Sequence, residues 1–181
     1  MNTFIPSKIF LTKGVGRHQE QLVSFEMSLR SAGIHFLNYV QVSSIFPPEA
    51  KLISRDEGLK LIKPGQVTHI VMSRNSTNEN RRLLGASIGI AIPSDKEMFG
   101  YLSEAHDFGK SDDELADYVE DLSITMISTI LGLPIDTNIS YDEQLEQWKV
   151  SDKIIKSKSI TQTAICGKNE WTTTIAAAVL I

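Results

Sequence analysis

Hydrophobic residues alternate with polar ones, or form short apolar blocks, along most of the chain, and this pattern predicts a protein rich in β-strands. The expected strands cover residues 8–12, 34–42, 67–72, 84–92 and 98–105. Two further β-rich runs, 154–165 and 171–181, flank the four residues Gly167–Glu170 and predict a terminal hairpin. Residues 51–62 mix charged and apolar positions without a clear period, so no element is assigned to them.

Two segments have the three- and four-residue spacing of an amphipathic helix. The first covers residues 18–32, ends at Gly33, and places on one face Leu22, Phe25, Leu29 and Ala32. The second begins at a capping box, Ser111-Asp-Asp-Glu114, and ends at Gly132 and Pro134. Its expected buried face is made by Leu115, Val119, Leu122, Met126 and Ile130.

Glycine, proline and polar residues mark the connections. Gly14–Gly16 and Pro64–Gly65 predict turns, residues 74–81 a polar surface loop, and residues 136–153 an acidic loop. Within residues 84–92, one face carries small residues, which predicts a central strand that another layer approaches closely: Ser87, Gly89 and Ala91. Strands outnumber helices and occur in mixed order, so we expect one α+β domain over residues 1–181.

Composition narrows the possible functions. The net charge is −4 and no basic tract is present, which argues against nucleic-acid binding. The single cysteine, Cys166, excludes an internal disulfide, which fits the cytoplasm, and its apolar neighbours predict a buried thiol. The start of the chain lacks the pattern of a signal peptide, and no apolar run reaches about 18 residues, so no membrane span is expected. The histidines lack ligand spacing, so we expect no metal site.

A chemically unusual stretch, Val42–Glu49, closes the predicted strand 34–42. Pro47 and Pro48 cannot donate ladder hydrogen bonds, so the strand must end near Ser43 and Ser44. The Ser44 hydroxyl lies one peptide away from the Ser43 carbonyl carbon, and it could attack that carbonyl, convert the peptide into an ester and depart by β-elimination. Residue 44 would then become a pyruvoyl group, a ketone that can form an imine with an amino acid and accept its electrons. A plain strand-to-turn junction would explain the same residues without chemistry.

Residues 38–50, Asn-Tyr-Val-Gln-Val-Ser-Ser-Ile-Phe-Pro-Pro-Glu-Ala, resemble the processing site of pyruvoyl-dependent arginine decarboxylases. Further similar stretches are residues 85–96, residues 100–104 and the apolar tail that ends in Ala176–Ala178. The resemblance implies self-cleavage between Ser43 and Ser44 into a β chain, 1–43, and an α chain, 44–181. The pyruvoyl group would derive from Ser44, and neither pyridoxal phosphate nor a metal would be needed.

The same resemblance implies a fold and a reaction. The expected fold is a four-layer αββα sandwich, two packed sheets flanked by helices, which assembles as a homotrimer of processed protomers. The expected reaction converts L-arginine to agmatine and carbon dioxide, and both polyamine synthesis and acid resistance are open as uses of agmatine.

Three side chains acquire roles by this resemblance. Glu104 matches the family's proton donor, and a glutamate must be buried to keep its proton at neutral pH. Asn38 matches an asparagine near the cleavage bond and the substrate, where its amide could polarise the Ser43 carbonyl. Glu26 stands where family members can carry an aspartate that meets the substrate guanidinium. Without the resemblance they would be a strand-end acid, an asparagine bonded to local backbone and a solvated helix carboxylate.

Three functional hypotheses therefore stand. The first is a self-processing arginine decarboxylase. The second is the same cofactor acting on another amino acid, such as histidine or aspartate, because Glu26 is one methylene longer than the aspartate it replaces. The third is an uncleaved, non-catalytic oligomeric binding module, against which the intact Ser44 and Glu104 argue.

Overall fold

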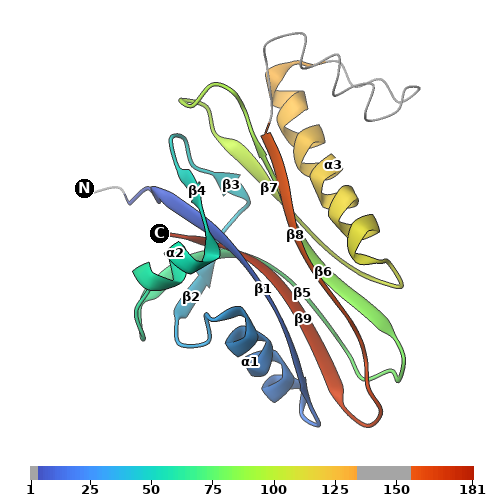
Figure 1. Cartoon of the computed structure of the whole chain (residues 1–181). Helices are drawn as coiled ribbons and strands as arrows, with labels where there is room; N and C mark the ends of the chain where they lie inside the picture. Colours follow the sequence, from blue (N-terminus) through green and yellow to red (C-terminus); the bar gives the residue numbers. More distant parts are fainter. Residues whose placement is uncertain (1–3, 134–155) are drawn as a thin grey trace.

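The computed structural model describes residues 4–133 and 156–181, which form two β-sheets and three helices (Figure 1). The five-stranded sheet has the order β2 (Asn38–Gln41), β5 (Val67–Thr77), β9 (Trp171–Leu180), β1 (Lys8–His18) and β4 (Lys51–Ile53). The four-stranded sheet has the order β3 (Ile45–Phe46), β7 (Gly100–Phe108), β6 (Leu83–Ile92) and β8 (Lys156–Ile165). The helices are α1 (Gln21–Ala32), α2 (Arg55–Leu61) and α3 (Asp112–Leu131). The α+β class predicted from the pattern of strands and helices is confirmed.

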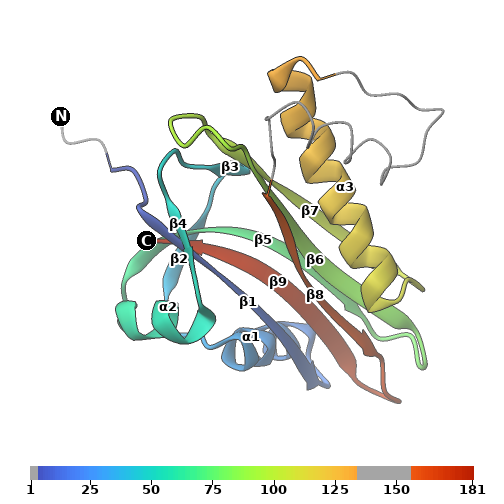
Figure 2. The ribbon, with the colours of Figure 1, turned by 45° about the horizontal axis from the view of Figure 1, so that its top comes forward.

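The two sheets share one apolar core. Ile9, Val71 and Ala178 of the five-stranded sheet pack with Ile88 and Leu102 of the four-stranded sheet in a single buried cluster. The alternate residues of β1, β5 and β9 point to the other side of their sheet and pack with α1. Helix α3 packs along β6, β7 and β8, as both views of the ribbon show (Figure 2). Each sheet therefore takes part in the shared core and also carries a helix.

Strand β6 has the central position that its small residues predicted. It pairs with β7 on one side and β8 on the other, and a Cβ atom at Gly89 would overlap the Val119 carbonyl of α3. The small face thus lets the helix approach the sheet closely. The capping box is also confirmed, because the Ser111 hydroxyl accepts a hydrogen bond from the Glu114 amide and the Glu114 carboxylate accepts one from the Ser111 amide.

The buried face of α3 differs from the predicted one. Leu115 and Val119 are buried as expected, but the stripe then continues through Ser123 and other residues, whereas Met126 is 36% and Ile130 46% exposed. The apolar pattern missed Ser123 because a serine can be buried when its hydroxyl bonds the helix backbone, here the Glu120 carbonyl at 2.9 Å.

The expected turn at Gly14–Gly16 is wrong. Strand β1 runs straight through it, and a Cβ atom at Gly14 or Gly16 would overlap the Ser28 or Ser24 carbonyl of α1. These glycines therefore permit close contact between helix and sheet. Helix α1 begins at Gln21, and Leu22 is 76% exposed rather than part of the buried face, while the stop at Gly33 is confirmed by its left-handed φ of 78°.

The boundaries of other elements also differ from those predicted. The strand expected at 34–42 shortens to β2, and β5 extends to Thr77, so part of the expected loop 74–81 is strand and Asn75 is buried. The unassigned residues 51–62 form β4 and α2. The turn at Pro64–Gly65 is confirmed. The acidic loop expected at 136–153 lies outside the described residues.

The predicted terminal hairpin is wrong, because β8 and β9 belong to different sheets. β8 pairs with β6, whereas β9 lies between β1 and β5. The Cys166 amide donates to the Arg82 carbonyl at 2.9 Å, which keeps the end of β8 with its own sheet. Strand β9 is buried on both faces, and its second half, Ile175–Leu180, is apolar on both, so it takes a central place in the five-stranded sheet. Cys166 itself is buried, as predicted.

We expect Gly16→Ala to lower the free energy of unfolding by about 2–3 kcal/mol, because the added methyl group forces α1 away from β1. Gly65→Ala is the matched control. Its φ of 78° is unfavourable for alanine, but nothing lies within 4 Å of the added atom, so about 1 kcal/mol should be lost. Urea unfolding of both variants checks the prediction, and equal losses would contradict the proposed close packing.

Candidate functional site

Ser44 lies at a bend between β2 of one sheet and β3 of the other. Figure 1 shows these two strands. The Ser43 carbonyl accepts a hydrogen bond from the Ile45 amide at 3.0 Å, which closes a tight turn around Ser44. The Ser44 carbonyl accepts one from the Leu102 amide of β7 at 2.8 Å. The backbone on both sides of the Ser43–Ser44 bond is therefore held in place.

The structure brings Ser44 and Glu104 together. The Ser44 hydroxyl donates a hydrogen bond to Glu104 Oε1 at 2.7 Å, although 60 residues separate them in the sequence. The contact follows from the pairing of β3 with β7, in which Ile45 lies opposite Tyr101. Continuing this antiparallel register places Leu102 opposite Ser44 and Glu104 two residues farther along β7.

The site is open in a single protomer. Ser43 and Glu104 are exposed and Ser44 is half-buried. The burial that a proton-donating glutamate requires is thus not supplied by the protomer alone.

Asn38 and Glu26 are not brought to this pair. Asn38 opens β2, and its Nδ2 donates to the Gly65 carbonyl at 3.0 Å. The chain stays extended from Asn38 to Val42, so the Cα atoms of these two residues are about 13 Å apart at the rise of a strand. Glu26 lies on α1, where its Oε1 is paired with Arg30 Nε at 2.6 Å. Within one protomer, Ser44 and Glu104 therefore lie together, whereas Asn38 and Glu26 lie away from them.

Two polar residues of β5 that the sequence analysis did not single out support the site. The Ser73 hydroxyl donates to the Ala105 carbonyl at 2.5 Å, and Asn75 Nδ2 donates to the Asp107 carbonyl at 2.9 Å. Both side chains are buried between the sheets. They bond carbonyls of β7 on either side of His106 and so link the strand that carries Glu104 to the five-stranded sheet. The sequence did contain a signal for these two residues, because the alternation of residue types typical of a strand continues through Thr77.

A shallow depression of about 280 Å³ borders Glu104 and is also lined by His106, Asp107, Lys110 and Tyr118. The Lys110 ammonium lies 3.0 Å from the Asp107 carboxylate. The hydrogen bond from Lys110, followed by that from the Phe108 amide, lowers the pKa of Asp107 below its usual range. Asp107 therefore stays ionised down to lower pH than an ordinary aspartate.

Within 4–133 and 156–181, no three histidine, cysteine, aspartate or glutamate side chains gather in a way that could hold a metal ion. No helix in these ranges has the length and hydropathy needed to cross a bilayer.

The fold and site together define an α+β protein in which a serine hydroxyl and a carboxylate meet where the chain crosses from one sheet to the other. The Ser43 carbonyl, just before that serine, accepts a hydrogen bond from the Ile45 amide. The site thus gathers a hydroxyl, a carboxylate and an amide donor around one peptide bond.

Comparison with known proteins gives the family. Residues 8–181 match the family described as pyruvoyl-dependent arginine decarboxylase. A protein of Chloroherpeton thalassium named probable pyruvoyl-dependent arginine decarboxylase is 54% identical over 180 residues, which cover 99% of each chain. Proteins named pyruvoyl-dependent arginine decarboxylase from Nitrosopumilus maritimus and Thermoplasma volcanium are 49% and 46% identical over 182 residues, covering 99–100% of each chain. The chain belongs to the pyruvoyl-dependent arginine decarboxylase family, as the resemblance implied.

We expect Lys110→Met to raise the pKa of Asp107 toward its ordinary value, because the substitution removes the largest cause of the shift. Carboxyl-carbon NMR titration of Asp107 measures this change. The depressed pKa adds stability above the unfolded-state pKa that is lost as the pH falls through the folded-state pKa. The variant should therefore lose less stability than the parent on acidification through that window. Lys63→Met, a substitution of an exposed lysine outside the depression, is the control and should leave the titration unchanged.

Proposed function

We propose that this protein cuts its own chain between Ser43 and Ser44 and then decarboxylates L-arginine to agmatine and carbon dioxide. The observation that carries the proposal is the 2.7 Å hydrogen bond between the Ser44 hydroxyl and Glu104, which joins the residue to be converted with the expected proton donor. The family and the names of full-length relatives support the reaction and the substrate.

The first step concerns the backbone. The Ser44 Oγ attacks the Ser43 carbonyl carbon, the peptide nitrogen leaves that carbon, and an ester takes the place of the amide. The Ile45 amide, which already donates to the Ser43 oxygen, stabilises the negative charge that develops on it. Loss of the Cα proton of residue 44 and of the ester oxygen from its Cβ then breaks the ester and leaves dehydroalanine. Water adds to this residue and its nitrogen departs as ammonia. The products are chain 1–43 with a free carboxylate and chain 44–181, which begins with the pyruvoyl group.

A pyruvoyl group at residue 44 supplies the electron-accepting carbonyl that α-decarboxylation needs. The surrounding residues fit such a group. The Leu102 amide holds the residue 44 carbonyl oxygen, and Glu104 lies within hydrogen-bonding reach of the residue 44 side chain. Glu104 delivers a proton to the substrate Cα after carbon dioxide leaves, a contribution of about 10²–10⁴-fold for a well-placed acid.

The complete site requires a second protomer in this proposal. The protein forms a homotrimer of four-layer αββα protomers in the cytoplasm, and a neighbour covers the exposed Glu104. Asn38 and Glu26, which lie away from Ser44 in their own protomer, reach the site from that neighbour. Glu26 then exchanges its surface pairing with Arg30 for the substrate guanidinium, which a carboxylate binds through two parallel hydrogen bonds.

Ser44→Ala should abolish cleavage, because alanine has no oxygen to attack the Ser43 carbonyl. Intact mass spectrometry of the purified protein should show one uncut chain for this variant and two chains for the parent, the longer one beginning with a pyruvoyl group. Ser43→Ala is the control, since its side chain is not the nucleophile and cleavage should persist. A Ser44→Ala protein that still splits at this bond would sink the proposed processing step.

Glu104→Gln should leave the two-chain mass pattern in place and lower kcat by about 10²–10⁴-fold, because glutamine still accepts a hydrogen bond from Ser44 but cannot deliver the proton. Carbon dioxide release from L-arginine measures the effect. Asp107→Asn, a change in the same depression, is the control and should retain most of the turnover. Full activity in Glu104→Gln would remove Glu104 from the reaction.

Coexpression of Asn38→Ala with Glu104→Gln should restore activity that neither variant has alone, to about a quarter of the parent level for random mixing of protomers. Some interfaces then combine an intact Glu104 with an intact Asn38. Ser44→Ala coexpressed with Glu104→Gln is the matched control. It should give no recovery, because Ser44 and Glu104 act within one protomer. Recovery in neither mixture would mean that Asn38 does not act across an interface.

A further inference from the structure

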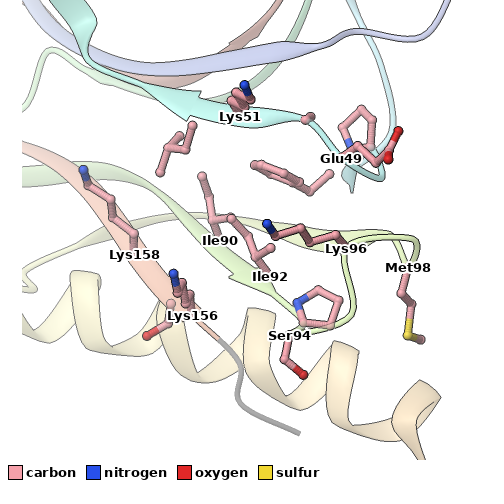
Figure 3. Close-up of a pocket in the computed structure, with 15 residues that line it drawn as sticks. Glu49, Lys51, Ile90, Ile92, Ser94, Lys96, Met98, Lys156 and Lys158 are labelled. Carbon is pink, nitrogen blue, oxygen red and sulfur yellow. The ribbon is translucent and has the colours of Figure 1, made fainter.

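A cavity of about 810 Å³ opens at the end of the molecule where the chain passes from β3 to β4. It lies between the two sheets, and its walls include Phe46, Leu52, Ile90 and Ile92 (Figure 3). The volume is that of a site for a drug-sized organic molecule. Ser44 and Glu104 are not among its lining residues, so this cavity is separate from the site described above.

Lysines surround the mouth of the cavity. They come from three parts of the chain, namely Lys51, Lys96, Lys156 and Lys158. Among the residues that the structure describes, no carboxylate forms an ion pair with any of these ammonium groups. Glu49 is the one acidic residue in the lining, and Figure 3 shows its carboxylate directed away from Lys96. The lining thus has four positive charges and one negative charge in a protein whose net charge is −4.

The backbone holds the two sides of the mouth together. The Glu49 amide donates to the Lys96 carbonyl at 2.9 Å, and Glu49 has a left-handed φ of 60°. Figure 3 shows the Lys96 side chain extending over the apolar floor near Ile92. A lysine whose aliphatic stem packs along apolar walls can present its ammonium group to the charged end of a ligand whose apolar body fills the space.

We propose that this cavity binds an organic anion, a carboxylate or a phosphate monoester whose apolar body lies between the sheets. The body packs against Phe46 and Ile90, and the charged group meets Lys96 and Lys158 at the mouth. The ligand also contacts Phe46 and Pro47, which follow Ser44 closely in the chain, and so stabilises one position of that segment. Because the binding site stands on the cavity and its lysines alone, it does not depend on decarboxylase activity.

Titration calorimetry of the full-length protein with three probes of one shape tests the proposal. The probes are 2-naphthoate, 2-naphthyl phosphate and the uncharged 2-naphthamide. We expect saturable one-to-one binding of at least one anion, about tenfold or more tighter than the amide, since a hydrogen bond to a charged group is stronger than one to a neutral group. High salt should weaken binding of the anion and leave binding of the amide unchanged. Binding of the carboxylate alone, or of the phosphate alone, identifies the head group.

Variants locate the site. The double variant Lys96→Gln/Lys158→Gln should lose about tenfold or more in affinity for the anion, whereas Lys63→Gln, outside the cavity, should bind like the parent. Ala50→Trp should fill the cavity and abolish binding of all three probes. Circular dichroism of each variant confirms that it is folded, and the exposed lysines can be replaced without disturbing the core. Equal affinity for anion and amide, or unchanged binding in the double lysine variant, would overturn the proposal, as would the absence of any binding.

Discussion

The hydrogen bond from the Leu102 amide to the Ser44 carbonyl is the constraint on which the rest of the site depends. The chain leaves the five-stranded sheet at β2 and enters the four-stranded sheet at β3, and Ser44 lies at that crossing. Pairing with β7 stops the crossing from being a free loop. Through the register of the two strands, this pairing also brings Glu104 within hydrogen-bonding distance of the serine hydroxyl.

Contacts between the two sheets make this arrangement rigid. The centre of the interface is apolar, but beside the outer part of β7 it becomes polar, where Ser73 and Asn75 donate to carbonyls of β7. These hydrogen bonds tie β7 to a strand of the opposite sheet. A site that is open to solvent can therefore still have fixed geometry.

The segment that follows Ser44 has two different sides. Ser44 faces the open surface with Glu104, whereas Phe46 and Pro47 face the lysine-lined cavity. The two-residue strand β3 follows Ser44 directly and contains Phe46. The proposed chemistry of the chain and the proposed anion site thus share one structural element, and any ligand that packs against Phe46 acts on the same strand that positions Ser44.

Local sequence determined the features that depend on neighbouring residues. The capping box of α3, the stop at Gly33 and the small face of β6 follow from side-chain chemistry within a few positions, and the Ser-Ser and Pro-Pro pairs mark the strand end. Tertiary structure alone decided which strands pair. The period of a helix or strand does not reveal which segment packs or pairs with it. For this reason β8 and β9 were expected to pair as a hairpin, and Gly14–Gly16 was expected to be a turn. The contact of Ser44 with Glu104 was implied by resemblance, but its geometry required the register of two strands far apart in the sequence.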